Sequence, residues 1–241
     1  MEREAMSTAA VPPAAWDVAH VLAEPTRREI FDAVRRARRP LTRDDVSRAS
    51  GFNRRLTAFH LDRLAAAGLL VTDYARPAGR AGGPGAGRPA KRYTAAPIEL
   101  DLTVPPRHYV FAARLLAQAV NDDPTDAAAA SMAVARAEGN RVGTLRRPVG
   151  RTAAKRSRAA AINALTDLGY EPAAEDPAAP AGAMRLRNCP FRAVADIAPD
   201  LVCGMNHELV SGLFDGLGLD ESGVALDPNP PNCCVTVTFP K

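Results

Sequence analysis

Three short helical patterns follow one another early in the chain, and each has its own start signal. They predict a small helical unit in this part of the chain. Pro25 stands at a first helical position, and apolar residues then recur on one helical face. Thr42 with Asp45 three residues later forms a variant of the capping box, and this second pattern ends at Gly51. Asn53 can cap a third helix.

The third helix has two distinguishable faces. Its spacing predicts a buried stripe of Thr57, Leu61 and Leu64. His60 lies beside this stripe, and a lone histidine in such a place is typical of a hydrogen-bonded core residue rather than a ligand. The first turn instead directs Arg54 and Arg55 outward, where they are available to a partner.

A β-hairpin is predicted after the helices. Leu69–Tyr74 and Arg92–Thr94 are its strands, and the Gly/Pro/Arg-rich stretch from Arg76 to Lys91 is its tip. Helix, helix-turn-helix and hairpin in this order make a winged helix, whose third helix enters the major groove while the wing reaches phosphates. The expected contacts to double-stranded DNA are Asn53, Arg54, Arg55, Ala58, Arg80, Arg88 and Lys91.

The charge distribution favours the same partner. Residues 1–98 hold 17 Lys and Arg against 10 Asp and Glu, whereas residues 99–241 hold 14 against 17, which gives formal charges of +7 and −3. A basic module that binds a polyanion, followed by a mildly acidic module, explains this asymmetry. The coding bias of a G+C-rich genome is an alternative source of scattered arginines.

Three separated segments resemble bacterial regulators related to the ArsR and DeoR types. They are Glu24-Pro25-Thr26-Arg27-Arg28, Phe59-His60-Leu61-Asp62-Arg63-Leu64 with Ala67-Gly68-Leu69-Leu70, and Gly87-Arg88-Pro89-Ala90-Lys91-Arg92-Tyr93. The segments occur in the right order, which makes the resemblance specific. It implies a winged-helix transcriptional regulator.

The remainder of the chain is expected to form an α+β unit of residues 108–241, joined to the DNA-binding domain of residues 1–98 by a linker at 99–107. Its helical middle segment is predicted at 109–121, at 126–138 with Gly139 as the stop, and at 151–168 with Gly169 as the stop. These helices are candidates for joining two copies into a homodimer, which suits operators read as two half-sites. Packing only within their own chain is the alternative.

A small sensor domain is predicted at the C-terminus, with strands at 182–191 and 233–239 around a helix at 199–217. On that helix Cys203 and His207 are one turn apart on one stripe, where they could share an ion. Alternation along the last strand places Cys233 on the side that covers the helix and Cys234 on the other side. Cys233 is therefore the expected partner of Cys203.

All four cysteines follow residue 188, which differs from the disulfide framework of a small secreted protein. Soft sulfur ligands select Zn²⁺ or an iron-sulfur cluster over Mg²⁺ or Ca²⁺. The spacing contains no Cys-x-x-Cys pair and does not choose between the two. Buried, inert cysteines are the structural alternative.

Further segments resemble the SufR branch of these regulators: Pro105-Pro106-Arg107, Asn188-Cys189-Pro190-Phe191, Leu201-Val202-Cys203-Gly204, and Leu226-Asp227-Pro228 leading to Cys233-Cys234-Val235. The resemblance implies a repressor of iron-sulfur assembly genes that binds a [4Fe-4S] or [2Fe-2S] cluster and changes its DNA affinity with cluster status. It maps Cys189, Cys203 and Cys233 onto the family's ligands. The fourth ligand stays open, with His207 and Cys234 as candidates.

A second hypothesis is a winged-helix regulator that senses an organic effector, with zinc or no metal at the cysteines. An enzyme is not expected, because the sequence has no serine elbow, HExxH, paired-carboxylate motif or nucleotide loop. No apolar run approaches the ~20 residues of a membrane span, and the N-terminal stretch is not that of a signal peptide. We therefore expect a cytoplasmic protein.

Overall fold

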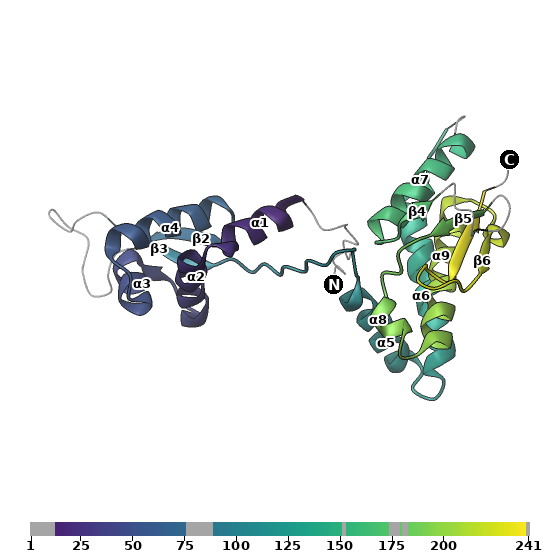
Figure 1. The fold of residues 1–241 in the computed structure, drawn as a ribbon, viewed down its shortest axis with the longest axis horizontal. Coiled ribbons are helices and arrows are strands. Elements are labelled where there is room, and N and C mark those ends of the chain that lie inside the picture. Colours follow the sequence, from purple (N-terminus) through teal and green to yellow (C-terminus); the bar gives the residue numbers. More distant parts are fainter. Residues whose placement is uncertain (1–12, 76–88, 151–152, 174–178, 180–182, 240–241) are drawn as a thin grey trace. The chain divides into compact units, whose positions relative to one another are not determined.

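The computed structural model describes residues 13–75, 89–150, 153–173, 179 and 183–239. The chain divides into two compact units, an N-terminal unit of Val11–Leu102 and a C-terminal unit that contains Thr103–Lys241. Both combine helices with a small antiparallel sheet, so the expected α+β class is confirmed (Figure 1). Within the described ranges, no helix has both the length and the apolar character that crossing a bilayer requires.

The N-terminal unit consists of four helices and a three-stranded sheet. Its elements are α1 (Pro13–Ala23), α2 (Pro25–Ala37), β1 (Leu41–Thr42), α3 (Arg43–Ser50), α4 (Arg54–Ala66), β2 (Leu70–Ala75) and β3 (Ala90–Ala95). The sheet has the order β1-β3-β2 with antiparallel pairs. Helix α1 and strand β1 are additions to the sequence prediction.

The predicted helix starts are confirmed by their hydrogen bonds. Thr42 and Asp45 form a complete capping box at α3, which ends at Gly51 in the left-handed conformation. The Asn53 side chain accepts from the backbone N–H of Leu56, 2.9 Å away, at the start of α4. These local bonds satisfy amides that have no partner inside the helix, which explains why the starts could be recognised from residue types alone.

His60 is a core residue of the N-terminal unit. It is buried, and the Arg27 Nε donates to its Nδ1 over 3.5 Å. Burial lowers the pKa of His60, while the Glu24 carboxylate, 3.5 Å away, acts in the opposite direction. The same carboxylate caps α2, so His60 ties the start of α2 to α4.

The hairpin differs from its prediction at the second strand. Strand β3 begins at Ala90 and pairs with β2 along its whole length, with Lys91 opposite Tyr74. The predicted tip, which extended to Lys91, was therefore too long, because composition does not reveal where a ladder begins. Arg80 and Arg88 lie outside the described residues.

The C-terminal unit packs helices on one four-stranded sheet. Its helices are α5 (Tyr109–Asp122), α6 (Ala127–Arg146), α7 (Ala153–Asp167), α8 (Arg192–Ala195) and α9 (Pro199–Leu217), with a 3₁₀ turn, η1 (Glu221–Gly223). Its strands are β4 (Pro172–Ala173), β5 (Ala183–Leu186), β6 (Val224–Leu226) and β7 (Val235–Thr238), in the order β4-β5-β7-β6.

The bounds of α9 are those predicted, but both strands that flank the cysteines are shorter than expected. Strand β5 ends at Leu186 rather than continuing to Phe191, and β7 begins at Val235 rather than at Cys233. Asn188 and Pro190 take the chain out of the sheet into a turn that leads to α8. Cys189, Cys233 and Cys234 consequently lie in connections, not in strands.

Helices α6 and α9 lie side by side (Figure 1) and cross with their backbones in contact. Four residues, the contact glycines, allow this approach: Gly139 and Gly143 on α6, and Gly212 and Gly216 on α9. A Cβ atom at Gly139 would overlap the carbonyl oxygen of Leu209 and lie 2.8 Å from the nitrogen of Leu213. Gly139 is thus not the predicted helix stop, because α6 continues to Arg146 and uses the missing side chain for packing.

We predict that Gly212→Ala destabilises the C-terminal unit by roughly 1–3 kcal/mol or more, because its Cβ would overlap the backbone of Arg136 on α6. The matched control is Gly204→Ala on the same helix, where the Cβ would meet only the flexible end of Met132. There the better helix propensity of alanine, up to ~1 kcal/mol, offsets the contact. Urea unfolding followed by circular dichroism checks both, and equal effects would contradict the backbone contact.

Candidate functional site

The four cysteines come from three segments of the C-terminal unit. Cys189 follows β5, Cys203 is in the second turn of α9, and Cys233 and Cys234 directly precede β7. Backbone hydrogen bonds fix these segments: the Cys233 N–H donates to the Leu186 carbonyl over 2.9 Å, and the Asp227 N–H donates to the Cys234 carbonyl over 2.7 Å. All four thiols are free of disulfides.

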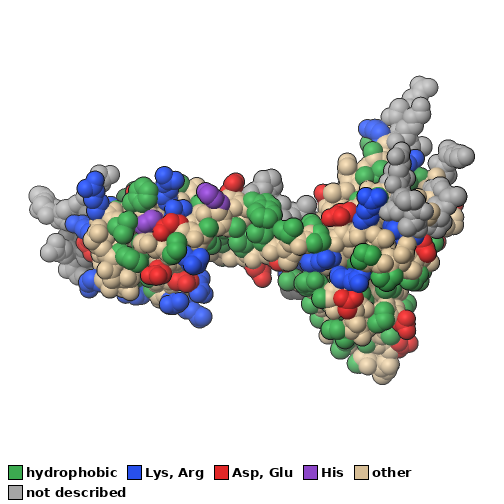
Figure 2. All heavy atoms as spheres, in the orientation of Figure 1, with side chains coloured by type: hydrophobic (Ala, Val, Ile, Leu, Met, Phe, Trp, Pro, Cys, Tyr) green, Lys and Arg blue, Asp and Glu red, His purple; other side chains and the backbone are tan. Residues whose placement is uncertain are grey.

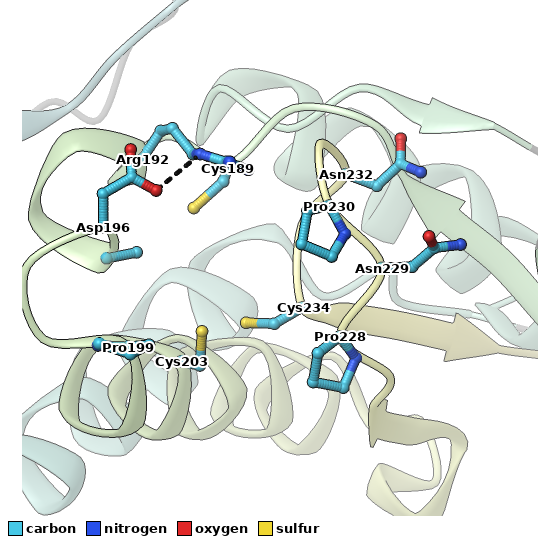
Figure 3. A pocket seen from close by; sticks show the side chains of 11 residues that line it. Cys189, Arg192, Asp196, Pro199, Cys203, Pro228, Asn229, Pro230, Asn232 and Cys234 are labelled. Carbon is cyan, nitrogen blue, oxygen red and sulfur yellow. Dashed lines mark ion pairs between the residues drawn. The ribbon is translucent and has the colours of Figure 1, made fainter.

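Three of these cysteines, Cys189, Cys203 and Cys234, line one cavity of about 150 Å³. Their sulfur atoms are directed toward its interior (Figure 3). The volume is well above the roughly 10–15 Å³ that a single water needs. The other lining residues are Arg192, Ala195, Asp196, Pro199, Pro228, Asn229, Pro230 and Asn232. The site therefore has room for a group larger than an ion.

Cys234, rather than Cys233, is the cysteine next to Cys203, which overturns the expected pairing. Cys234 lines the cavity together with Cys203 and Cys189, whereas Cys233 is fully buried and absent from the lining. Strand alternation misassigned the doublet because both residues precede the strand, where the alternation of side chains does not apply.

Asn206 is a site residue that the sequence analysis missed. Its side chain is buried, and its Nδ2 donates to the Cys233 Sγ over 3.0 Å. Its Oδ1 accepts from the buried Tyr170 hydroxyl. The position three residues after Cys203 on α9 was the available signal, because such residues share a helix face. The same Nδ2 lies 3.9 Å from the Cys234 Sγ, so Asn206 contacts both cysteines of the doublet and Tyr170 holds Asn206 in place.

His207 does not join the cysteines. It is absent from the cavity lining, and its Nδ1 lies 3.2 Å from the Glu208 Oε1. The cavity covers only the first turns of α9, at Pro199 and Cys203, so a residue one turn further along is beyond it. The expectation that Cys203 and His207 share an ion thus fails on geometry.

Two of the four thiols have a lowered pKa, and the other two have a raised pKa. Hydrogen bonding from Cys233 lowers the pKa of Cys189, and it lowers that of Cys234 to about 6. Burial raises the pKa of Cys203 to about 12, and hydrogen bonding to Cys189 raises that of Cys233 well above its ordinary value. Thiolates are the form that binds metals.

Thiol sulfurs are soft ligands, which suit Zn²⁺ or an iron-sulfur cluster. Among the described residues, no three His, Cys, Asp or Glu side chains are gathered closely enough to hold one metal ion. A Zn²⁺ site would require the thiols to move together. The thiolates of an iron-sulfur cluster bind different iron atoms around a larger core, so they can stand around a cavity without converging on one point.

The predicted DNA-contacting residues of α4 are at its exposed start. Arg54 and Arg55 are exposed, and Ala58 is half-buried. The Arg54 Nε lies 2.7 Å from an Asp44 oxygen, whereas Arg55 has no hydrogen-bond or ion-pair partner in the described part of the chain. On β3, the Lys91 ammonium pairs with Asp62 at 3.1 Å. Figure 2 shows basic side chains at several margins of this unit, with acidic ones between them.

No protein-family model matches this chain, and no curated protein or solved structure is detectably similar to it. The functional argument therefore depends on the residues and their geometry.

We predict that iodoacetamide modifies Cys234 before Cys203 in the metal-free protein at pH 7, because the thiolate is the reactive form and the pKa of Cys234 is lowered to about 6 while that of Cys203 is raised to about 12. Exposure alone would favour the opposite order, since Cys203 is the less buried of the two. The Cys234 rate should fall about ten-fold per pH unit below pH 6. Mass spectrometry with fragmentation separates Cys234 from Cys233. Faster labelling of Cys203 would contradict this order of the two pKa values.

Proposed function

We propose that this protein is a DNA-binding transcriptional regulator whose operator affinity is controlled by an iron-sulfur cluster in its C-terminal unit. The observation that carries the proposal is the convergence of Cys189, Cys203 and Cys234, from three segments, on one cavity. Inert core cysteines have no need for a shared cavity with room for a ligand. Repression of iron-sulfur assembly genes is the regulatory role implied by the sequence resemblance.

The proposed DNA reader is a winged helix in the N-terminal unit. Support comes from the element order of three helices and a hairpin after α1, and from strand β1 completing a small sheet with the hairpin. In this motif α4 is the recognition helix, and its first turn is the part that reaches base edges. The exposed Arg55 suits such contact, since arginine is the commonest reader of guanine.

In the proposed sensor, Cys189, Cys203 and Cys234 would hold the cluster. The cluster would supply a group whose presence depends on iron supply and on oxidants. Asn206 donates to Cys233, and hydrogen bonding from Cys233 lowers the pKa of Cys189 and Cys234, so buried neighbours hold the candidate ligands. Arg192 lies at the cavity and forms an ion pair with Asp196, its Nε 3.0 Å from the carboxylate (Figure 3).

A homodimer is part of the proposal. Operators are commonly read as two half-sites by a two-fold symmetric protein. Helix α5 exposes the apolar side chains of Val110 and Val120, which supports an interface on the helical segment. Sedimentation equilibrium of the full chain measures the oligomeric state.

We predict that Cys189→Ser, Cys203→Ser and Cys234→Ser each abolish cluster binding, whereas Cys233→Ser retains most of it. The reason is that only the first three sulfurs open into the cavity. Anaerobic reconstitution followed by iron, sulfide and visible absorption measurements tests this, with circular dichroism as the control for folding. A wild-type protein that remains colourless and binds zinc, or no metal, would favour the organic-effector hypothesis instead.

We predict that Arg55→Ala weakens operator binding by ~1–3 kcal/mol, because an unpaired arginine at the start of a recognition helix reads bases directly. Arg63→Ala is the matched control, since Arg63 is exposed in the last turn of the same helix. Fluorescence anisotropy with operator DNA at fixed salt provides the measurement. Equal losses for the two variants would remove the first turn of α4 from the interface.

A further inference from the structure

The first residues of the C-terminal unit are hydrogen-bonded to the loop that contains Cys189. This segment, residues 103–108, follows directly on Leu102, the last residue of the N-terminal unit. The Arg107 Nη1 donates to the Asn188 Oδ1 over 2.7 Å and also to the carbonyl oxygen of Cys189. The His108 N–H donates to the Pro190 carbonyl over 3.0 Å. Three consecutive loop residues thus accept hydrogen bonds from two consecutive residues of the segment.

Asn188 is the buried centre of this arrangement. Its Nδ2 donates to the Pro106 carbonyl over 2.8 Å and to the carbonyl of Gly169, which follows α7. Both the oxygen and the nitrogen of its side-chain amide are therefore hydrogen-bonded, and the buried side chain cannot move without breaking several hydrogen bonds. Gly169 has a positive φ of 84°, and a Cβ there would meet the His108 ring at 2.7 Å. The segment and its surroundings are therefore closely packed.

We infer that Arg107 and Asn188 form a coupling clamp, through which a change at Cys189 reaches the chain where it leaves the N-terminal unit. The inference rests on the proposed function for its biological purpose, since it names the connection between the sensor site and the DNA reader. The proposed connection between the cavity and Arg107 passes through a single residue. The sulfur that lines the cavity and the carbonyl that binds Arg107 belong to the same residue, so a displacement of Cys189 strains or breaks the clamp.

The clamp has the properties of a two-state element. Arg107 is only half-buried, so water can replace its two acceptors when the loop moves. Loss of a hydrogen bond to a charged group shifts an equilibrium by about ten-fold or more, which lies within the roughly 5- to 150-fold range of a typical coupling between two sites. The guanidinium also helps to lower the pKa of Cys189, after hydrogen bonding from Cys233 and the backbone N–H of Phe191.

Hydrogen exchange of the full-length metal-free protein tests the clamp without any cluster. Arg107→Ala should accelerate exchange at the His108 amide and in the loop at 187–192 by about ten-fold, the equivalent of one hydrogen bond to a charge. Arg114→Ala is the matched control, because Arg114 is an exposed arginine on α5, more than one helix turn along the chain from Arg107. No acceleration in the loop, or the same acceleration with Arg114→Ala, would overturn the clamp.

Transmission from the cysteine is tested in a variant that keeps only Cys189, with Cys203→Ser, Cys233→Ser and Cys234→Ser. Alkylation of Cys189 with iodoacetamide should accelerate exchange at the His108 amide, and it should have no further effect when Arg107→Ala is added. Acceleration confined to residues 187–192 would overturn the inference. Circular dichroism before and after alkylation checks that the unit stays folded.

The two proposals fail in different ways. If alkylation is transmitted to His108 but loading with iron and sulfide leaves operator affinity unchanged, the clamp stands and the proposed function fails. If loading changes operator affinity and Arg107→Ala leaves that change intact, the proposed function stands and the clamp is wrong.

Discussion

The close crossing of α6 and α9 is the constraint on which the candidate sensor site depends. The contact glycines bring the two backbones together and remove the freedom of α9 to slide or rotate. Helix α9 supplies Cys203 to the cavity and Asn206 to the thiols, so both are placed by the packing of residues further along the same helix. A few ångströms of movement along α9 would separate Cys203 from Cys234. The site is therefore built by helix packing as much as by its cysteines.

Features with local causes could be predicted from the sequence, and features with tertiary causes could not. Thr42 and Asn53 cap their helices through bonds to amides three residues away, and their residue types already indicate this. Gly139 looked like a helix stop, because the helix that requires a glycine there is about seventy residues away in the chain. The cysteine doublet was misassigned by one residue for a similar reason. The start of β7 is set by its partner strands, not by its own alternation.

Burial determines how the thiols of the four cysteines titrate. The four cysteines are largely buried, and hydrogen bonding from Cys233 and Asn206, rather than water, lowers the pKa of Cys234. Such a network is satisfied only while all members keep their places. Arg107 and Asn188 form hydrogen bonds that join the Cys189 loop to the first residues of the C-terminal unit. The loop therefore connects the cavity to the start of this unit.

The most direct test of the account is the dissociation constant of wild-type protein for operator DNA, measured anaerobically with the cluster loaded and after its removal, at the same salt concentration. Salt must be fixed because phosphate contacts make the affinity depend strongly on it. The account predicts that the two dissociation constants differ at least about five-fold, the lower end of a typical coupling free energy. Equal constants, for a protein shown to have contained the cluster, would contradict it.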